Sequence, residues 1–371
     1  MSNETLLCVG SGLAPRYRAN TLQALALPSG SQLQFRYSDQ LIPEGLREPL
    51  AKKEFANAKV ILGYVDCTET GRQPDDRCFV IPYRRAKLLN SERRGSIFIL
   101  TFELSEFCLA SNLEAFQETL SNNSPHWKLD RDGKPVMNSK GKPTFEGDWC
   151  QKLSDGQLTV ATSDFGQWQM IVKQLRHRAD YAKQSYFFLI EGLFCRKEGV
   201  KGGVLVRPDQ GEYRLHPGRN YEFRMVHYDP DADEHSGEKH SELFKFDVSA
   251  PLMTLRSNPL LIIDSPYDLK SVHFSTGEPN RREYGSLFLH SEQPADEADL
   301  VLDVYFPVSV KGDMWKVVRN GFILGALLTA TQLVSIFSKG SVDNWRVVCS
   351  LAAALGFLTG FFVSFGMRKP L

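Results

Sequence analysis

Two apolar runs near the C-terminus decide how the chain is organised: GFILGALLTATQLVSIF at Gly321–Phe337 and VVCSLAAALGFLTGFFVSF at Val347–Phe365. A bilayer core of about 30 Å needs roughly 20 apolar residues of helix. Neither run contains Asp, Glu, Lys, Arg or His, which are costly in lipid. We therefore expect a transmembrane helical hairpin over residues 320–367, with residues 338–346 as its polar connector. The alternative is a buried pair of helices in a soluble domain.

Each predicted helix carries a ridge of small side chains at every fourth position. Small residues let helix backbones approach closely in lipid, where no hydrophobic force drives helices together. The two ridges could face each other within one hairpin, or one ridge could form the hairpin while the remaining surface forms an oligomer. The ridge residues are Gly321, Gly325 and Thr329 in the first helix, and Ala352, Gly356, Gly360 and Ser364 in the second.

Three polar residues of the first helix, Thr331, Gln332 and Ser335, could line a pore. Single hydroxyls also bond back to the helix backbone, so these residues permit a pore without requiring one.

Charge around the hairpin predicts its orientation. Basic residues flank both of its outer ends: Lys311, Lys316, Arg319, Arg368 and Lys369. The positive-inside bias then places both chain ends in the cytoplasm. The first residues show no secretory signal pattern, and seven cysteines without CxxC spacing fit reduced thiols. We expect the residues before the hairpin to form cytoplasmic domains.

Residues 1–120 predict an α+β domain that is mostly antiparallel β. Alternating or continuous apolar patterns indicate strands at 6–9, 32–37 and 60–65, and a hairpin over 79–104 with a polar break at 90–95. Helices are expected at 43–57 and 105–120.

The turn Gly10-Ser11-Gly12 resembles a phosphate loop only superficially. That fingerprint requires a helix directly after the turn, and here Pro15-Arg16-Tyr17-Arg18 follows. We expect no nucleotide site and no cofactor.

Residues 121–157 contain repeated turn signals and predict a long polar loop or insertion. Trp127 and Trp149 indicate that part of it docks on a surface or a partner. Residues 158–185 follow, in which apolar residues at helical spacing predict an amphipathic helix that bridges two domains.

Residues 186–308 predict an immunoglobulin-like β sandwich, because about seven short strands alternate with turn-rich breaks. The strands are expected at 186–195, 203–207, 220–227, 243–248, 260–264, 286–289 and 300–308. A stalk, residues 309–319, then enters the predicted hairpin. The fold class is therefore mostly β, with a C-terminal transmembrane hairpin.

A basic cluster lies on and beside the predicted 79–104 hairpin: Arg84, Arg85, Lys87, Arg93 and Arg94. Cationic side chains that neutralise a nucleic-acid backbone release counterions, so the cluster could bind nucleic acid. A solvated edge strand, protected from aggregation by its charge, explains the same residues. The formal net charge of zero makes any such attraction local.

An acidic loop between residues 229 and 240 offers weak metal candidates, namely Asp231, Asp233, His235 and His240. Its alternate aspartates resemble the start of a calcium loop, but Glu234 stands where that loop needs glycine. Imidazoles with carboxylates could bind zinc or manganese. A polar, solvent-exposed hairpin tip explains the same residues, and we expect no metal site.

No catalytic motif supports an enzyme. The chain has no GxSxG, HExxH or GxxxxGK[ST] pattern and no compact group of His, Cys and Asp. Distant residues could still form a triad in the fold, but no residue is nominated as a nucleophile.

The order of domains, with soluble β domains followed by the hairpin at Gly321–Phe365, resembles membrane-acting effectors of bacterial antiphage defence, including retron and cyclic-oligonucleotide systems. The resemblance implies a sensor in the bacterial inner membrane that oligomerises, or is released from a regulatory complex, and then disrupts the bilayer. Two alternatives remain open: a non-enzymatic membrane-tethered scaffold, and a membrane-anchored nucleic-acid receptor.

Overall fold

A computed structural model describes residues 5–12, 15–67, 77–139, 143–153, 159–176, 186–196, 202–231, 241–292 and 302–312. The chain divides into two compact units, Met1–Gly277 with Tyr284–Ser309 and Glu278–Glu283 with Val310–Leu371. The helices and strands described below lie in the first unit, except for Glu283 and Val310, the end residues of two strands, which belong to the second unit. No helix within the described ranges is long and apolar enough to cross a membrane. The predicted hairpin, residues 320–367, lies outside them.

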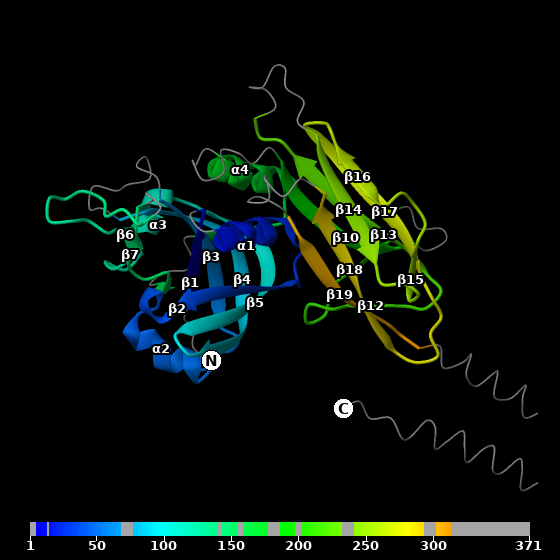
Figure 1. Ribbon diagram of the computed structural model, residues 1–371, viewed down its shortest axis with the longest axis horizontal. Helices are drawn as coiled ribbons and strands as arrows, with labels where there is room; N and C mark the ends of the chain where they lie inside the picture. The colour runs from blue at the N-terminus through cyan, green and yellow to red at the C-terminus, as the bar shows by residue number, and fades with distance from the viewer. Residues whose placement is uncertain are drawn as a thin grey trace, which may run out of the picture. The chain divides into compact units, whose positions relative to one another are not determined.

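The N-terminal half is built on one seven-stranded sheet (Figure 1). Its order is β2-β5-β4-β3-β1-β8, and β9 pairs with β5 beside this path. The strands are β1 (Thr5–Ser11), β2 (Gln32–Ser38), β3 (Lys59–Asp66), β4 (Phe79–Arg94), β5 (Ile97–Ala110), β8 (Cys150–Leu153) and β9 (Thr159–Thr162). Helices α1 (Pro15–Ala26) and α2 (Glu44–Ala51) and the 3-10 turn η1 (Asp39–Leu41) connect the first three strands.

Strands β1 and β3 form a parallel pair, while the pairings β1–β8, β2–β5, β3–β4, β4–β5 and β5–β9 of this sheet are antiparallel. Both are buried along almost their whole length, as continuous apolar runs in parallel strands require. Helix α1 contacts β1, β2 and β4. The mostly antiparallel α+β character expected from the sequence is therefore present.

The hairpin of β4 and β5 is longer than its sequence pattern indicates. β4 continues to Arg94, so the turn consists of Gly95 and Ser96 rather than the polar break expected at 90–95. The helix expected over 105–120 was partly wrong, because β5 extends to Ala110 and only α3 (Leu113–Glu118) is helical. Pairing of β5 with both β4 and β9 overrides the helical spacing of Phe107 and Leu109.

The long loop expected at 121–157 contains short strands where the structure describes it. They are β6 (His126–Trp127), β7 (Phe145–Glu146) and β8. Trp127 and Trp149 are both buried. Helix α4 (Phe165–Arg176) follows β9 and buries its apolar face through Trp168, Ile171, Val172 and Leu175.

The second half is a β sandwich of two five-stranded sheets, β11-β10-β13-β17-β15 and β12-β19-β18-β14-β16 (Figure 1). The first contains β10 (Phe187–Cys195), β11 (Val204–Val206), β13 (Asn220–Tyr228), β15 (Met253–Leu255) and β17 (Tyr267–Thr276). The second contains β12 (Tyr213–Leu215), β14 (Glu242–Val248), β16 (Leu260–Ile263), β18 (Glu283–Ser291) and β19 (Val304–Val310). Three of these strands, β12, β15 and β17, were not expected from the sequence.

Aromatic side chains from the two sheets interlock in the sandwich core. The ring centroids of Phe188 and Phe244 lie 4.7 Å apart, as do those of Phe223 and Phe246. These contacts join β10 and β13 of one sheet to β14 of the other, and such pairs stabilise a core beyond the area they bury.

Candidate functional site at the first strand, turn and helix

The carboxyl ends of the parallel strands β1 and β3 form the most promising site among the described residues. Ser11, the last residue of β1, pairs with Val65, the penultimate residue of β3. Ser11 and the neighbouring Asp66 are almost completely buried, and both engage in further interactions. In α/β folds, ligands bind outside the carboxyl ends of parallel strands, so this edge is where a ligand would be sought.

Helix α1 begins directly after the β1 turn and packs closely on it. A Cβ at Gly10 would lie 3.7 Å from the Tyr17 carbonyl oxygen and 3.5 Å from Thr21 Oγ1. These are ordinary van der Waals distances, so α1 passes close to Gly10 without requiring a glycine there. The sequence analysis rejected a phosphate loop at Gly10-Ser11-Gly12 because no helix was expected directly after the turn. A helix, α1, does follow it, so that reason was wrong.

Tyr17 fixes the start of α1 against the sheet. Its hydroxyl donates to the Arg36 carbonyl oxygen at 3.0 Å, and its ring stacks with those of Tyr37 and Trp149 at centroid distances of 6.3 and 5.8 Å. Tyr37 in turn donates to the Val9 carbonyl oxygen at 2.8 Å. The first turn of α1 is therefore held by β1, β2 and the residue that precedes β8.

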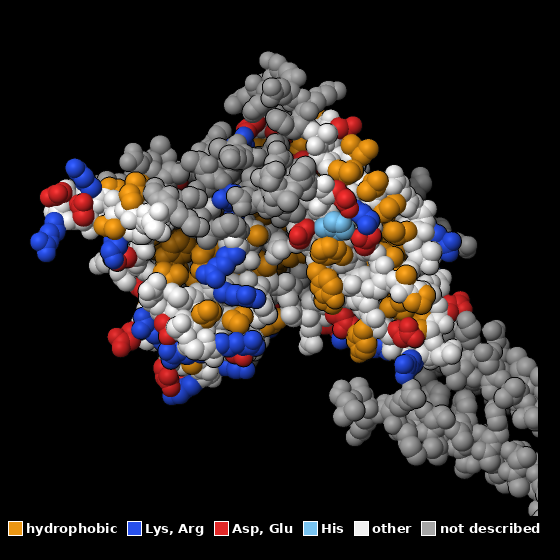
Figure 2. Space-filling view, in the orientation of Figure 1, with side chains coloured by type: hydrophobic (Ala, Val, Ile, Leu, Met, Phe, Trp, Pro, Cys, Tyr) orange, Lys and Arg blue, Asp and Glu red, His pale blue; other side chains and the backbone are white. Residues whose placement is uncertain are grey.

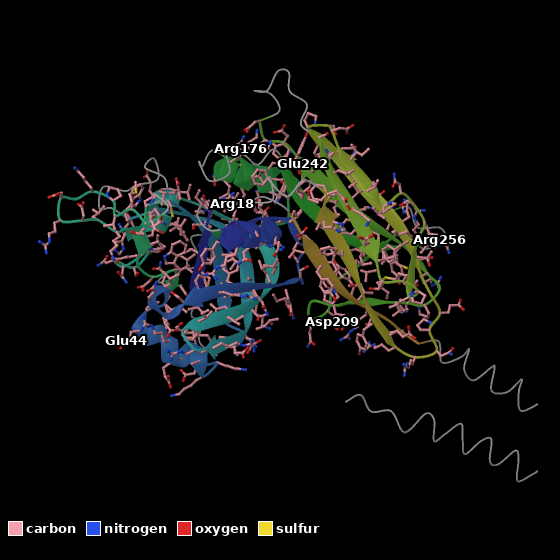
Figure 3. All side chains as sticks on the ribbon, viewed as in Figure 1. Arg18, Glu44, Arg176, Asp209, Glu242 and Arg256 are labelled. Atoms are coloured by element: carbon pink, nitrogen blue, oxygen red, sulfur yellow. The ribbon has the colours of Figure 1, made fainter. Side chains whose placement is uncertain are left out.

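Two arginines give this end of α1 a positive charge. Arg18, labelled beside α1 in Figure 3, donates from Nε and Nη2 to the Gly12 carbonyl oxygen at 3.2 and 3.0 Å. Arg16 lies over the Tyr17 ring and donates to the Tyr17 hydroxyl at 2.8 Å. The first turn contains no acidic residue. A cationic helix start opposes the usual charge preference of the helix dipole, and this arrangement favours an anionic ligand over a cationic one.

Sequence reasoning did not place Arg16 and Arg18 together at the start of a helix. The glycine turn after a buried strand was the available signal, and the helix that gives it meaning was not recognised.

The structure does not assemble the predicted basic cluster on one surface. Arg84 is 1% exposed, and its guanidinium donates to the Ala24 carbonyl oxygen at 3.1 Å and lies 3.9 Å from the Phe107 ring centroid. Burial lowers the pKa of Arg84 to about 9. Arg85 donates to the Thr159 carbonyl oxygen, which connects β4 to β9. These two arginines therefore serve contacts inside the domain.

The remaining cations of that cluster lie at the surface, mostly beside carboxylates. Arg93 pairs with Asp39 at 2.6 Å, and Arg94 pairs with Glu92 at 2.8 Å. Lys87 is exposed and lies opposite Glu103 in the sheet register. Local pairing reduces the positive potential that nucleic acid would encounter.

A buried pair of thiols lies two residues before the glycine turn. Cys8 on β1 and Cys150 on β8 are register partners, with their Sγ atoms 3.5 Å apart. Both are free cysteines. Burial, followed by the hydrogen bond with Cys150, raises the pKa of Cys8 well above its usual value, so Cys8 is a neutral thiol rather than a reactive thiolate.

The acidic loop contributes one ion pair to the described part of the structure. Asp231 pairs with Arg176 of α4 at 2.5 Å, and Asp229 accepts a hydrogen bond from the Asp231 N–H at 2.9 Å. The other metal candidates, Asp233, His235 and His240, lie outside the described residues. No group of three or more potential ligands is found within the described ranges.

The residues expected to pack or line the transmembrane hairpin also lie outside the described residues. They are Gly321, Gly325, Thr331, Gln332, Ser335, Ala352, Gly356, Gly360 and Ser364.

No protein-family model matches the chain, and a search of curated proteins finds no match. Solved structures are similar to parts of this chain, and three of them cover a third of it or less. A chaperone–tip adhesion subunit complex of Acinetobacter baumannii Csu pili has a TM-score of 0.20 and 8% identity over 28% of this chain and 54% of that chain. PapD-like domain 7 of human CEP192 has a TM-score of 0.19 and 12% identity over 33% of this chain and 87% of that domain. The C. elegans MSP family member WR4 has a TM-score of 0.17 and 12% identity over 28% and 92%. The chain thus spans about half the length of the first of these structures.

Proposed function

We propose that this protein is a membrane-tethered sensor and effector without enzymatic activity. Its N-terminal α+β domain recognises a ligand or partner, and recognition leads to oligomerisation and disruption of the bilayer by the C-terminal hairpin. The proposed setting is the inner membrane of a bacterium, with the described domains in the cytoplasm and a role in antiphage defence.

The continuity of the sandwich with the apolar runs carries this proposal. β19 lies between β12 and β18 in its sheet, and Val304, Phe306, Val308 and Val310 are buried. Only residues 311–320 separate its end from Gly321, the first residue of the first apolar run. A ligand shifts a two-state protein only through differential contacts with the two states. A well-packed strand followed by a short connector is suited to transmit such a shift along the chain.

Membrane activity is tested with the full chain expressed in bacteria. We expect overexpression to collapse the membrane potential, measured with a potential-sensitive dye. Gly356→Leu and Gly360→Leu should abolish the collapse, because leucine on the small-residue ridge separates the helices. Ala354→Leu, on the same predicted helix but off the ridge, should retain it.

The scaffold alternative makes the opposite prediction. If an unrelated membrane anchor in place of residues 320–367 preserves protection against phage, measured by plaque counts, the hairpin serves only as a tether. Loss of protection with retained membrane attachment supports the effector.

A nucleic-acid receptor would depend on the exposed cations Lys87, Arg93 and Arg94. Its binding would weaken steeply with salt. Nucleic acid that co-purifies and persists after charge reversal at these positions would exclude this cluster as its site.

A further inference from the structure

Strand β16 (Leu260–Ile263) is an edge strand of the second sandwich sheet, because it pairs with β14 and stands at the end of the strand order. Edge strands expose backbone hydrogen-bonding groups, and soluble proteins usually protect them with lysine, proline, a bulge or an inward charge. β16 has the sequence Leu-Leu-Ile-Ile and carries no charge of its own.

The free backbone groups of β16 belong to Leu260 and Ile262. The Phe246 N–H donates to the Pro259 carbonyl oxygen at 2.9 Å, in the same register that pairs Lys245 with Leu260. Backbone groups of an antiparallel strand alternate in direction. Pro259, Leu261 and Ile263 therefore face β14, whereas Leu260 and Ile262 face the open edge.

Only one of these outward groups has a partner among the described residues. The Leu260 N–H does not bond to β14 and donates to Asn258 Oδ1 at 3.0 Å. Among the described residues, the Leu260 carbonyl and the Ile262 N–H and carbonyl have no hydrogen-bond partner.

The side chains of the same two residues are also exposed. Leu260 is 40% exposed and Ile262 is 56% exposed, while Leu261 and Ile263 point into the core. Figure 2 shows hydrophobic side chains over the region of β16, next to a histidine and charged side chains over the region of β14. An uncharged edge with an exposed aliphatic row is a template for strand addition.

We propose that β16 pairs antiparallel with β16 of a second copy of this chain. With Leu261 on the two-fold axis, Leu260 of each copy lies opposite Ile262 of the other. Because both residues direct their backbone groups outward, each Leu260–Ile262 pair can exchange both of its hydrogen bonds once the Leu260 N–H leaves Asn258 Oδ1. The two five-stranded sheets then become one continuous sheet, and the contact is isologous and closed.

The flanking residues favour a second copy over an unrelated strand. In this register Asn258 lies opposite Asp264 of the other copy, so an amide faces a carboxylate and no like charges meet. Lys270 lies 3.9 Å from Asp264 and further offsets its charge. Pro259 lacks an N–H, but its backbone faces β14, so this absence costs the new pairing nothing.

The pairing deepens the proposed function by naming a surface for oligomerisation, and only its link to membrane disruption rests on that function. Its tests therefore measure association of the purified full chain, which is independent of any effect on a bilayer.

The register is tested by cysteine cross-linking in mild detergent. Leu260→Cys and Ile262→Cys chains with different tags are co-expressed and oxidised with copper phenanthroline. The six cysteines within the described residues are buried. We expect a disulfide between the two tags in the mixture, and at least a tenfold lower yield from either variant alone. Equal yields in all three samples, or none in the mixture, would overturn the proposed register.

The backbone contribution is tested by a matched pair of variants at Ile262. Both Ile262→Pro and Ile262→Thr replace the isoleucine side chain with a smaller one, but only proline removes the outward N–H. We expect the dissociation constant, measured by concentration-dependent light scattering, to rise at least tenfold more for proline than for threonine. Circular dichroism should show both variants folded. Folded variants with equal dissociation constants would exclude pairing through this edge.

Discussion

At the residue scale, Arg84 is a buried cation that supports the end of a helix. Its guanidinium bonds the Ala24 carbonyl oxygen near the C-terminus of α1, and α1 has no basic residue in its own last turn. Cations near helix C-termini are favourable, and hydrogen bonds to charged groups contribute about 1.5–3 kcal/mol. We expect Arg84→Met to lower the free energy of unfolding by about 2 kcal/mol in urea denaturation. Lys87→Met, at an exposed position of the same strand, should change it by less than about 0.5 kcal/mol. Equal effects of the two substitutions would contradict this role.

His227 gives the sandwich a predicted sensitivity to acid. Burial lowers the pKa of His227, and the nearby Lys270 lowers it further, although the Ser265 carbonyl bond and Asp264 and Asp268 oppose the shift. Because the pKa in the folded protein is below the unfolded value of about 6.5, the unfolded chain binds the proton more readily. Stability should therefore be full above about pH 6.5 and should decrease as the pH falls below it.

The measurement compares urea denaturation at pH 7.5 and pH 5. His227→Gln keeps a side-chain donor for the Ser265 carbonyl but does not titrate, so it should reduce the loss of stability in acid. His216→Gln, at an exposed position, should show the same loss as the original protein. A loss that His227→Gln leaves unchanged would assign the acid sensitivity to other groups.

The same residues show where sequence reasoning about sites stops. Spacing alone made Arg84 and Arg94 members of one cationic cluster, yet the bulges in β4 and the packing of α1 bury one and leave the other exposed. Arg16 and Arg18 carried no signal until a helix was known to follow the glycine turn. The positions of arginine and lysine in the sequence therefore did not show which of them are exposed or which lie close together in the fold.

At the element scale, the buried parallel strand β3 depends on one glycine. A Cβ at Gly63 would lie 3.1 Å from Val80 Cγ1, 3.2 Å from Val9 Cγ1 and 3.3 Å from Leu7 Cδ1. We expect Gly63→Ala to destabilise the protein by about 1–3 kcal/mol, because added volume in a packed core forces its neighbours to move.

The control is Gly45→Ala in α2, where a Cβ would meet nothing within 4 Å. That change should stabilise by up to about 1 kcal/mol through helix propensity. Thermal unfolding of both variants shows whether each substitution lowers or raises stability. Stabilisation by Gly63→Ala would show that the core around β3 can accommodate a Cβ at this position.

Strands with clear apolar patterns were predicted better than those that depend on a neighbour. The strong runs of β1, β3 and β10 were recognised from their own residues, because continuous or alternating burial is encoded locally. β17 escaped notice because its exposed and half-buried positions hide the alternation, and pairing with β13 and β15 defines it. Helix α1 was missed because arginine, asparagine and glutamine interrupt its apolar face, and packing on the sheet determines it.

At the scale of the whole molecule, α4 connects the N-terminal sheet domain to the sandwich. Trp168 is completely buried; its Nε1 donates to the Leu25 carbonyl oxygen of α1 at 3.2 Å, and its ring lies 6.2 Å from that of Tyr228 on β13. On the same helix, Phe165 contacts Tyr267 of β17. Helix α1 also packs directly on β10 of the sandwich. A signal that starts near α1 can therefore reach the sandwich directly or through α4, and unfolding of the two parts should be coupled.

Removing this connection should separate the two unfolding events. Trp168→Ala deletes contacts with both parts and should cost about 3–5 kcal/mol. We also expect calorimetry of the full chain in detergent to resolve two transitions where the original protein shows one, because domains that lose their contact unfold independently. Met170→Ala changes an exposed side chain of the same helix and should leave the single transition in place. One cooperative transition in Trp168→Ala would mean that the other contacts between the parts are sufficient to couple them. These include the packing of α1 on β10 and the Gln23 donation to the Asp303 carbonyl oxygen. In that case α4 would not be required for the coupling.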